Sequence, residues 1–251
     1  MSSFLVLWDV DYTLVDTAGV GRHLYQAAFA ELYGRDLPER ATRANMAGRT
    51  DRAIVLEVLA LAGVADPRGQ VSLFEAALGR LAPSAAGMVA ASGRAMPGAA
   101  AALDAFAAVP GVVQSLLTGN VRPVAEVKLE PLGLVSHLDL QVGAYGNEHE
   151  VRAELVRLAR HRAAVAYDAD FGGEATVLVG DTPLDIEAAL ATGARAVGVA
   201  TGQFTLAELL AASPHAALAD LSDTPELVAA VLGGTRGDLG PGEESYQPRP
   251  A

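Results

Sequence analysis

The sequence of 251 residues contains no cysteine. Disulfides, zinc–thiolate sites and thiol nucleophiles are therefore excluded, and the composition fits a reducing compartment. Basic residues are also scarce, because 18 Lys and Arg stand against 30 Asp and Glu and leave a net charge of −12. No basic run stands out, so we expect neither nucleic acid nor an anionic membrane as a partner. Any site for an anionic ligand must be made positive locally, by a metal ion, a basic side chain or backbone N–H groups.

Long hydrophobic runs are absent too. No stretch approaches the roughly 20 apolar residues that a membrane helix needs. The N-terminus lacks a basic region and its apolar run is broken early by Asp9, so we do not expect a signal peptide. Half of the residues are apolar (51%), enough for a sizeable core in one large domain or a domain with an insert. We expect a soluble, cytoplasmic protein, monomeric or homodimeric.

Short apolar runs that end at polar or glycine residues predict the strands. Four are continuous, as expected for strands covered on both faces, and one alternates, which favours a place nearer the sheet edge. The continuous runs are residues 4–8, 112–117, 176–179 and 195–199, and the alternating run is 138–142. Helical patterns lie between them, over residues 99–108, 121–132, 150–164 and 185–192. The alternation predicts an α/β fold with a doubly wound parallel sheet, whose ligands bind at the carboxyl ends of the strands.

One stretch, from about residue 16 to residue 93, contains no convincing strand. Its spacing predicts helices over residues 20–33, 51–62 and 70–81. We therefore expect an inserted all-helical cap, residues 16–94, in a catalytic core made of residues 1–15 and 95–232. Residues 93–98 are a candidate hinge. Residues 233–251 are rich in glycine, proline and glutamate and predict a disordered tail.

The sharpest chemical signal is Asp9-Val10-Asp11-Tyr12-Thr13, directly after the first predicted strand. Two aspartates separated by one residue at a strand end are unusual, although Asp and Thr are also common in plain turns. The segment Gly180-Asp181-Thr182-Pro183-Leu184-Asp185 follows another strand in the same way. If a helix begins here with Thr182 as its N-cap, Asp185 has a structural role as the N3 residue of a capping box. This alternative gives no role to Asp181, which ends a buried strand.

A third strand end carries Thr118-Gly119-Asn120. Asn120 suits a helix N-cap, and the hydroxyl, the glycine and free N–H groups together also suit an anion site. All three segments would lie on one rim of the sheet. Four carboxylates, those of Asp9, Asp11, Asp181 and Asp185, would then converge and raise one another's pKa unless a cation is bound. Oxygen ligands without thiolates or paired histidines favour Mg²⁺.

These three segments resemble, in this order, the signature motifs of the haloacid dehalogenase superfamily of hydrolases. The helical insert resembles that superfamily's type-1 cap, and the resemblance covers residues 1–232. It implies a Rossmann-like core and a phosphatase acting on a small-molecule phosphate monoester. Dehalogenases of the superfamily usually lack the second aspartate, so Asp11 favours phosphate chemistry.

The resemblance also implies roles for the residues. Asp9 would attack phosphorus and form an aspartyl-phosphate, and Asp11 would act as general acid and then base. Mg²⁺ would bind the Asp9 side chain, the Asp11 backbone carbonyl and Asp181, with Asp185 close by. Thr118 and the N–H groups of Gly119 and Asn120 would hold the phosphoryl oxygens. Thr13 would support the turn beside the phosphate.

The superfamily also uses a basic residue beside the phosphoryl group, usually in a Lys-Pro pair that this sequence lacks. Arg152 and Lys128 are the two candidates, and we favour Arg152 because it opens the helix before the 176–179 strand. Lys128 lies eight residues past Asn120, about 12 Å along a helix. The plain alternative for Arg152 is an ion pair with Glu148. For Lys128 it is a surface charge, or a partner for Glu130 or another acidic residue.

Two further positions bear on specificity. Tyr12 stands where the superfamily usually has glycine, which supports a sharp turn. Gly48-Arg49-Thr50-Asp51 resembles a cap loop that faces the active site in phosphoglycolate-phosphatase-like members. Arg49 would there bind a substrate carboxylate or second phosphate, or else be a solvated charge beside an N-cap Thr50.

Two other functions stay open at this point. A sugar phosphomutase would use the same aspartyl-phosphate and return the phosphoryl group to its substrate. An inactive phosphate-binding module, or a phospho-receiver, would keep the acidic cluster without turnover. Receivers are much shorter and lack a helical insert after the first strand.

Overall fold

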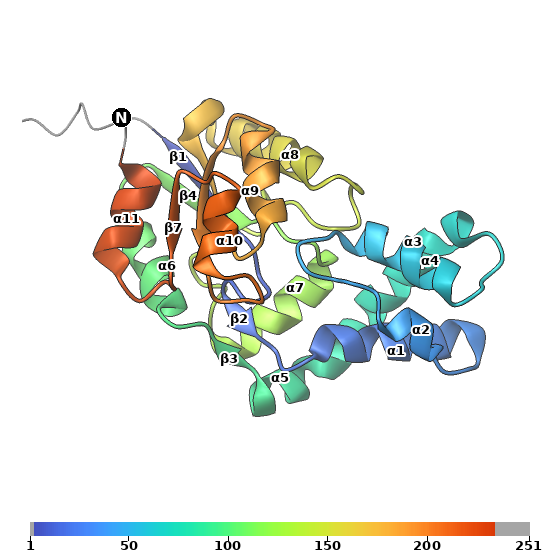
Figure 1. The fold of residues 1–251 in the computed structure, drawn as a ribbon. Coiled ribbons are helices and arrows are strands. Elements are labelled where there is room, and N and C mark those ends of the chain that lie inside the picture. The colour runs from blue at the N-terminus through green and yellow to red at the C-terminus, as the bar shows by residue number, and fades with distance from the viewer. Residues whose placement is uncertain (1–2, 234–251) are drawn as a thin grey trace, which may run out of the picture.

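The computed structural model describes residues 3–233, and its core is a parallel five-stranded sheet (Figure 1). The strand order is β4-β1-β5-β6-β7. The bounds are Phe4–Trp8 for β1, Val112–Leu116 for β4, Thr176–Gly180 for β5, Arg195–Val199 for β6 and Ala216–Leu218 for β7. The chain places β4 on one side of β1 and β5 on the other, so the order reverses beside β1. Ligands of such sheets bind at this reversal, outside the carboxyl ends of the strands.

Helices cover both faces of the sheet, because strand side chains alternate between two apolar layers. Val6 and Trp8 of β1 face the layer that contains Phe106, whereas Leu5 and Leu7 face the opposite layer. The first layer holds α6 (Ala99–Ala107) and α11 (Thr224–Leu232). The second holds α8 (Arg152–Tyr167), α9 (Pro183–Leu190) and α10 (Leu206–Ala211). The predicted doubly wound fold is confirmed.

The predicted strand at 138–142 is wrong, because this segment turns instead of extending. The Asp139 carboxylate accepts the Gln141 N–H at 2.9 Å, a local bond that competes with a strand ladder. A single parallel bridge, between Leu117 and Ala144, remains nearby. Conversely, the three-residue strand β7 and the helices α10 and α11 were not predicted from the sequence. Short alanine-rich elements carry little periodicity.

The insert is helical, as predicted, and has an apolar centre of its own (Figure 1). Its elements are α1 (Val20–Tyr33), α2 (Glu39–Thr42), α3 (Asp51–Leu61), α4 (Pro67–Leu81), a 3-10 turn (Ala82–Ala85) and α5 (Ala86–Ser92). The two chain segments that connect it to the core pair as a short antiparallel ribbon, β2 (Val15–Asp16) with β3 (Arg94–Ala95). The insert is thereby held at both ends by one ribbon, next to the candidate hinge.

Helix α7 (Arg122–Leu129) joins the two apolar centres, and a 3-10 turn (Glu130–Leu132) follows it. Its Ala125 and Leu129 face the sheet, whereas Val124 and Val127 face the cap helices. A further 3-10 turn (Gly173–Ala175) precedes β5. The predicted tail, residues 233–251, lies outside the described residues apart from Gly233.

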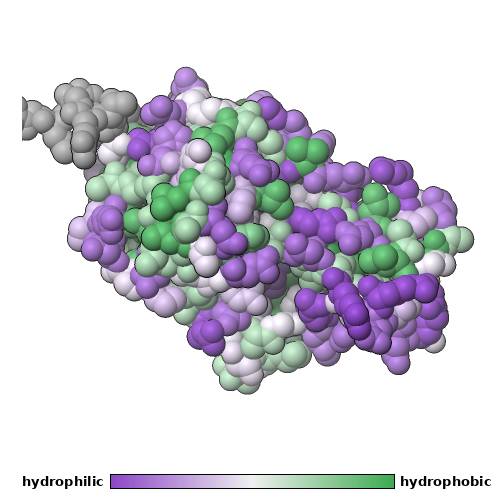
Figure 2. Space-filling view, in the orientation of Figure 1, coloured by the Kyte–Doolittle hydropathy of each residue, from purple (hydrophilic) through white to green (hydrophobic). Residues whose placement is uncertain are grey.

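The hydropathy of the surface differs between the cap and the core (Figure 2). Hydrophilic residues gather over the outer cap helices, and apolar residues gather around α10, where Leu210 is 54% exposed. Within residues 3–233, no helix combines the length and the apolar character needed to cross a bilayer.

We predict that the cap depends on the Phe74 ring. Phe74 is fully buried on α4 and its ring lies 5.5 Å from that of Tyr25, whereas the neighbouring Leu73 is 49% exposed. Phe74→Ala should lower the free energy of unfolding by about 3–5 kcal/mol, because it opens a cavity. Leu73→Ala, the matched control, should change it by less than about 1 kcal/mol. Urea denaturation followed by circular dichroism measures both, and equal losses in the two variants would contradict the packing described.

Candidate active site

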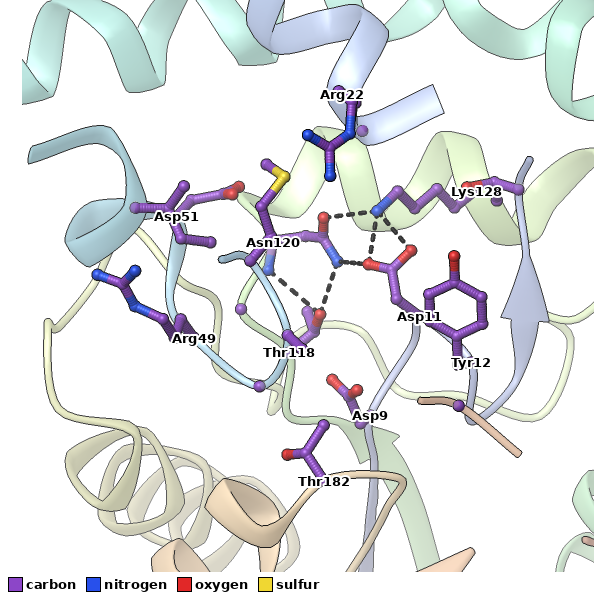
Figure 3. Close-up of a pocket in the computed structure, with 18 of the residues that line it drawn as sticks. Asp9, Asp11, Tyr12, Arg22, Arg49, Asp51, Thr118, Asn120, Lys128 and Thr182 are labelled. Carbon is purple, nitrogen blue, oxygen red and sulfur yellow. Dashed lines mark hydrogen bonds and ion pairs between the residues drawn. The ribbon is translucent and has the colours of Figure 1, made fainter. Parts of the chain in front are cut away.

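Three strand ends meet at the carboxyl edge of the sheet, as the sequence predicts. Asp9 follows β1 and continues its pairing, since its N–H donates to the Val179 carbonyl at 2.9 Å. Thr118 lies just beyond β4, and Asp181 directly follows β5. All three line one cavity of about 700 Å³ between the core and the cap (Figure 3). Parallel strands thus bring Asp9 together with two residues that lie more than 100 positions further along the chain.

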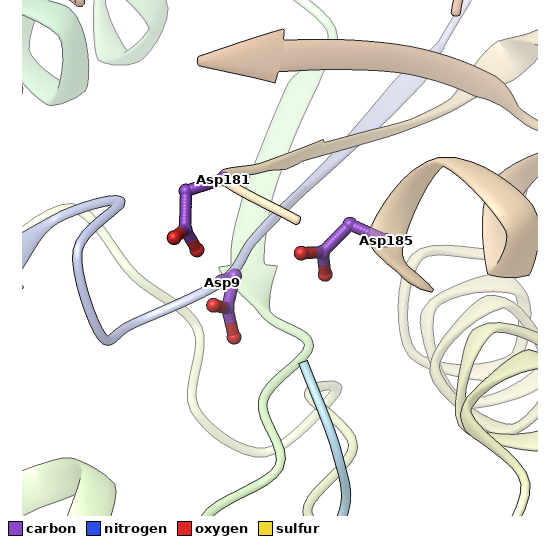
Figure 4. Close-up of side chains that lie close together, drawn as sticks. All are labelled: Asp9, Asp181 and Asp185. Atoms are coloured by element: carbon purple, nitrogen blue, oxygen red, sulfur yellow. The ribbon is translucent and has the colours of Figure 1, made fainter. Parts of the chain in front are cut away.

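Asp9, Asp181 and Asp185 form a buried acidic cluster (Figure 4). One oxygen of each carboxyl group lies within 4.8 Å of the others. Burial raises the pKa of Asp9 to about 7, and the Arg152 guanidinium opposes part of that rise. Burial and the Asp9 and Asp185 carboxylates raise the pKa of Asp181 to about 9. The cluster therefore holds more negative charge than its surroundings stabilise.

Arg152 is the cation that faces this cluster. Its Nη2 donates to Asp9 Oδ1 at 2.7 Å and to the Leu117 carbonyl at 3.1 Å. The same Nη2 lies 2.6 Å from Asp185 Oδ1, an ion pair without hydrogen-bond geometry. Burial lowers the pKa of Arg152, but the two carboxylates outweigh it and the net direction is upward. The alternative pairing with Glu148 is wrong, because Glu148 pairs with Arg162.

The acidic cluster suits a hard divalent cation. The Asp181 carboxylate accepts no hydrogen bond from residues 3–233, so it is free to act as a ligand. A side chain at Gly202 would bring its Cβ within 1.8 Å of Asp181 Oδ2, and glycine leaves that carboxylate uncovered. Buried oxygen ligands of this kind are those that Mg²⁺ binds. The Asp11 carboxylate is not part of the cluster, and its predicted metal contact through the backbone carbonyl stays a prediction.

Asp11 belongs to a second group of polar side chains (Figure 3). Lys128 Nζ donates to both Asp11 carboxylate oxygens, at 2.8 and 2.6 Å, and to Asn120 Oδ1 at 2.8 Å. Asn120 Nδ2 donates to Asp11 Oδ2 at 2.8 Å. The surface-charge alternative for Lys128 is wrong, because its side chain is buried. The alternative of an acidic partner is confirmed, with Asp11 as the partner and not Glu130. Helix α7 runs along the cavity, so the long lysine side chain reaches back to the strand end.

The two basic candidates therefore occupy different places in one site, Arg152 at Asp9 and Lys128 at Asp11. Distance along the helix does not exclude contact here, so both basic residues reach the site and neither replaces the other. A signal was available in the composition. Lys128 is the one lysine of the sequence, which uses arginine at its other 17 strongly basic positions.

The Thr118-Gly119-Asn120 segment is tightly held by local bonds. Thr118 Oγ1 accepts the Asn120 N–H at 3.2 Å and Asn120 Nδ2 at 2.9 Å. Asn120 is not the N-cap of α7, a position held by Val121. A side chain at Gly119 would bring its Cβ within 2.0 Å of the Arg49 carbonyl, so only glycine fits there. The phosphate contacts predicted for these three residues stay predictions.

The turn after Asp9 departs from ordinary backbone geometry at Tyr12. Its φ of 58° lies in the left-handed region, which explains why glycine is usual at this position. Thr201 Oγ1 donates to the Tyr12 carbonyl at 2.5 Å and fixes the turn. Thr13 is fully buried, does not line the cavity, and its hydroxyl has no hydrogen-bond partner within residues 3–233.

The cap contributes the loop before α3. Thr50 is the predicted N-cap, since its Oγ1 accepts the Ala53 N–H at 3.3 Å. Arg49 lines the cavity, but its guanidinium pairs with Glu57 and donates to the Asn45 carbonyl at 3.0 Å. Its predicted contact with substrate stays a prediction. In Figure 3 this side chain points away from the Asp11 group.

Sequence reasoning missed Asp51, which ties the cap to the core. Its N–H donates to the Gly119 carbonyl at 2.6 Å, and its carboxylate accepts the Val121 N–H and the Tyr25 hydroxyl, both at 2.7 Å. Burial raises the pKa of Asp51 to about 6, although both hydrogen bonds oppose the rise. No local pattern distinguishes such a residue from an ordinary first-turn aspartate. Arg22, on the first turn of α1, also lines the cavity and was also missed.

Fold and site together define a doubly wound α/β protein with a buried acidic centre at the carboxyl edge of its sheet. The sequence model of one family, described as haloacid dehalogenase-like hydrolase, matches residues 6–190. The chain belongs to this family. It is 31% identical over 234 residues to "Probable phosphatase IndB" of Dickeya dadantii (strain 3937), covering 91% of this chain and 94% of that protein. It is accordingly a phosphatase-like hydrolase of the haloacid dehalogenase superfamily.

Solved structures share the fold at low sequence identity. A predicted phosphatase from Clostridium acetobutylicum aligns with a TM-score of 0.65 at 16% identity, over 93% of this chain and 100% of that one. A predicted phosphoglycolate phosphatase from Haemophilus somnus 129PT aligns with a TM-score of 0.63 at 16% identity, over 91% and 99%. These similarities support the architecture of core and cap.

We predict that cation binding to the acidic cluster releases protons. With pKa values of about 7 and about 9, Asp9 and Asp181 are mostly protonated at pH 6 in the cation-free protein. The pKa values of both groups in the folded protein lie above the ordinary value of 3.8. The protonated carboxyls therefore contribute stability at low pH, and this contribution is lost as the pH rises through the two folded pKa values. A cation needs the ionised forms, so its affinity should rise between pH 6 and 9, by up to about tenfold per pH unit for each proton displaced.

Calorimetric titration with MgCl₂ in two buffers of different ionisation enthalpy counts the released protons. An affinity that stays constant from pH 6 to pH 9 would contradict the prediction that cation binding displaces protons from these carboxyls.

Proposed function

We propose that this protein is a Mg²⁺-dependent, phosphoglycolate-phosphatase-like enzyme that hydrolyses a small-molecule phosphate monoester through an aspartyl-phosphate on Asp9. The observation that supports the proposal most is the division of the two strand-end aspartates between two environments. Asp9 is buried beside Arg152 and the acidic cluster, whereas Asp11 is held by Lys128 and Asn120 with its side chain 38% exposed to the cavity. This difference supports a role in attack for Asp9 and a role in proton transfer for Asp11.

In the first step Asp9 attacks phosphorus, and the bond between phosphorus and the ester oxygen breaks. Asp11 gives its proton to the departing alkoxide, which leaves as the alcohol. Arg152 keeps Asp9 oriented through the 2.7 Å bond to Oδ1. A cation bound by Asp9, Asp181 and Asp185 would neutralise charge on the phosphoryl oxygens.

In the second step Asp11 takes a proton from water, which attacks the phosphorus of the aspartyl-phosphate. The bond to Asp9 breaks, and inorganic phosphate leaves with the Asp9 carboxylate restored. Lys128 and Asn120 hold Asp11 in place during both transfers. Thr118, Gly119 and Asn120 line the cavity at the end of β4, where they are placed to contact phosphoryl oxygens.

The cap closes the cavity over these residues and sets the size and charge of the substrate. Arg49 is the cap residue proposed from the sequence to meet a second anionic group, a role that would require its guanidinium to leave Glu57. Thr13, buried under the turn, would act by supporting the backbone at Asp11. A cytoplasmic location and a monomeric or homodimeric state complete the proposal.

We predict phosphate release only with the metal ion and with both strand-end aspartates intact. A screen of phosphorylated metabolites should show release with Mg²⁺ and none with EDTA. Asp9→Asn should lower kcat by at least about 10⁴-fold, as removal of a nucleophile does. Asp11→Asn should lower it by about 10²- to 10⁴-fold, the range of acid–base catalysis.

Asp104→Asn is the matched control, since Asp104 is an exposed aspartate that pairs only with His137, and it should keep full activity. Full activity in Asp9→Asn would exclude Asp9 as the nucleophile. Formation of an isomeric phosphate ester instead of inorganic phosphate would favour the phosphomutase. A stable phosphoprotein that never turns over would favour the inactive module.

A further inference from the structure

Six cationic side chains line the cavity within the described chain, and five of them are paired with a carboxylate. The pairs are Arg43 with Glu39, Arg49 with Glu57, Arg94 with Asp16, Lys128 with Asp11, and Arg152 with Asp9. The sixth is Arg22. Its Nη1 donates to the Thr42 carbonyl, and no carboxylate of residues 3–233 lies within ion-pair distance of it. In a chain with a net charge of −12, a guanidinium at the cavity without a carboxylate partner is a candidate binding group for an anionic ligand.

Arg22 is held directly above the reacting residues. It lies on the first turn of α1, next to Gly21, where an added Cβ would be 3.5 Å from Lys128 Nζ. The helix therefore passes over the lysine that binds Asp11. In Figure 3 the Arg22 side chain points from the cap towards Asn120 and Lys128, on the far side of the cavity from Asp9. Burial and the carboxylates of Asp16, Asp11 and Asp181 raise the pKa of Tyr12, and the Arg22 charge opposes part of that rise.

The start of α1 adds to the positive character of this wall. Gly19, its N-cap, is in the left-handed conformation with φ 91° and makes no side-chain cap. Gly19, Gly21 and Arg22 all line the cavity. Leu24, Ile54 and Leu78 of the cap also line the cavity and are apolar, whereas the cap cations Arg43 and Arg49 there are each paired with a glutamate. A negative group on this side of the cavity therefore has Arg22 as its nearest free cation.

We infer that Arg22 is a specificity-determining residue that binds a second anionic group of the substrate, a carboxylate or a second phosphate, while the reacting phosphate lies at Asp9. The inference rests on the proposed function. A guanidinium offers paired N–H donors whose geometry matches both groups. The Thr42 carbonyl occupies one nitrogen, and Nε and Nη2 have no acceptor within residues 3–233. The preferred substrate is then a small metabolite with a phosphate at one end and a second negative group a few bonds away.

The test compares substrates that differ only in the second group. One pair is 3-phosphoglycerate and glycerol 3-phosphate, which differ by a carboxylate, and the other is ribose 1,5-bisphosphate and ribose 5-phosphate. The wild-type enzyme should prefer the doubly anionic member of at least one pair, and the pair that shows the preference tells carboxylate from phosphate. In Arg22→Met the ratio of the two kcat/KM values should fall by about 10- to 100-fold, as loss of a charge-assisted hydrogen bond predicts.

Two further variants keep the result interpretable. Arg22→Lys retains the charge and should keep more of the preference than Arg22→Met, which separates lost charge from a disturbed α1. Arg43→Ala removes a cavity cation already paired with Glu39 and should leave the ratio within about twofold of wild type. An unchanged ratio in a folded Arg22→Met would overturn the inference and leave the proposed function standing. No Mg²⁺-dependent phosphate release from any ester would instead remove the proposed function.

Discussion

The main constraint on the site is the electrostatic repulsion among the Asp9, Asp181 and Asp185 carboxylates, which positive charge nearby must offset. Burial alone favours their neutral forms, as the raised pKa values of Asp9 and Asp181 show. Arg152 compensates part of this charge, and a divalent cation would compensate the rest. A protein keeps such a cluster at a cost in stability, so the arrangement is typical of a functional site.

A second constraint is the contact between cap and core. The loop before α3 passes so close to Gly119 that a side chain there would meet the Arg49 carbonyl. Asp51 completes this contact through the Gly119 carbonyl and the Val121 N–H. Gly146 packs against the same place, where an added Cβ would lie 1.6 Å from the Gly119 carbonyl. The glycines allow the cap loop to approach the Thr118-Gly119-Asn120 segment without any side chain between them.

The three cations of the site have different partners. Arg152 serves the buried cluster, Lys128 serves Asp11 at the cavity wall, and Arg22 stands free on the cap side. Carboxylates offset Arg152 and Lys128, whereas no carboxylate within residues 3–233 pairs with Arg22, so a substrate anion would meet unpaired positive charge on the cap side. The local field, and not the net charge, then determines which ligands the cavity accepts.

The sequence by itself determined four of the five strands, the helical insert and the acidic strand ends. Continuous apolar runs predict buried parallel strands, and parallel strands place Asp9, Thr118 and Asp181 on one rim because their carboxyl ends coincide. These inferences need only local pattern and one rule of topology. The same reasoning failed at residues 138–142, where alternation suggested a strand and a side-chain bond of Asp139 produced a turn.

Tertiary structure alone decided the partners of the charged residues. Lys128 meets Asp11 because α7 packs lengthwise beside the cavity, and Arg152 reaches Asp9 across 143 positions of sequence. Asp51 and Arg22 acquire their places only when the cap docks on the core. Side-chain contacts of this kind depend on how helices are oriented in space, and spacing along the chain carries no information about that orientation.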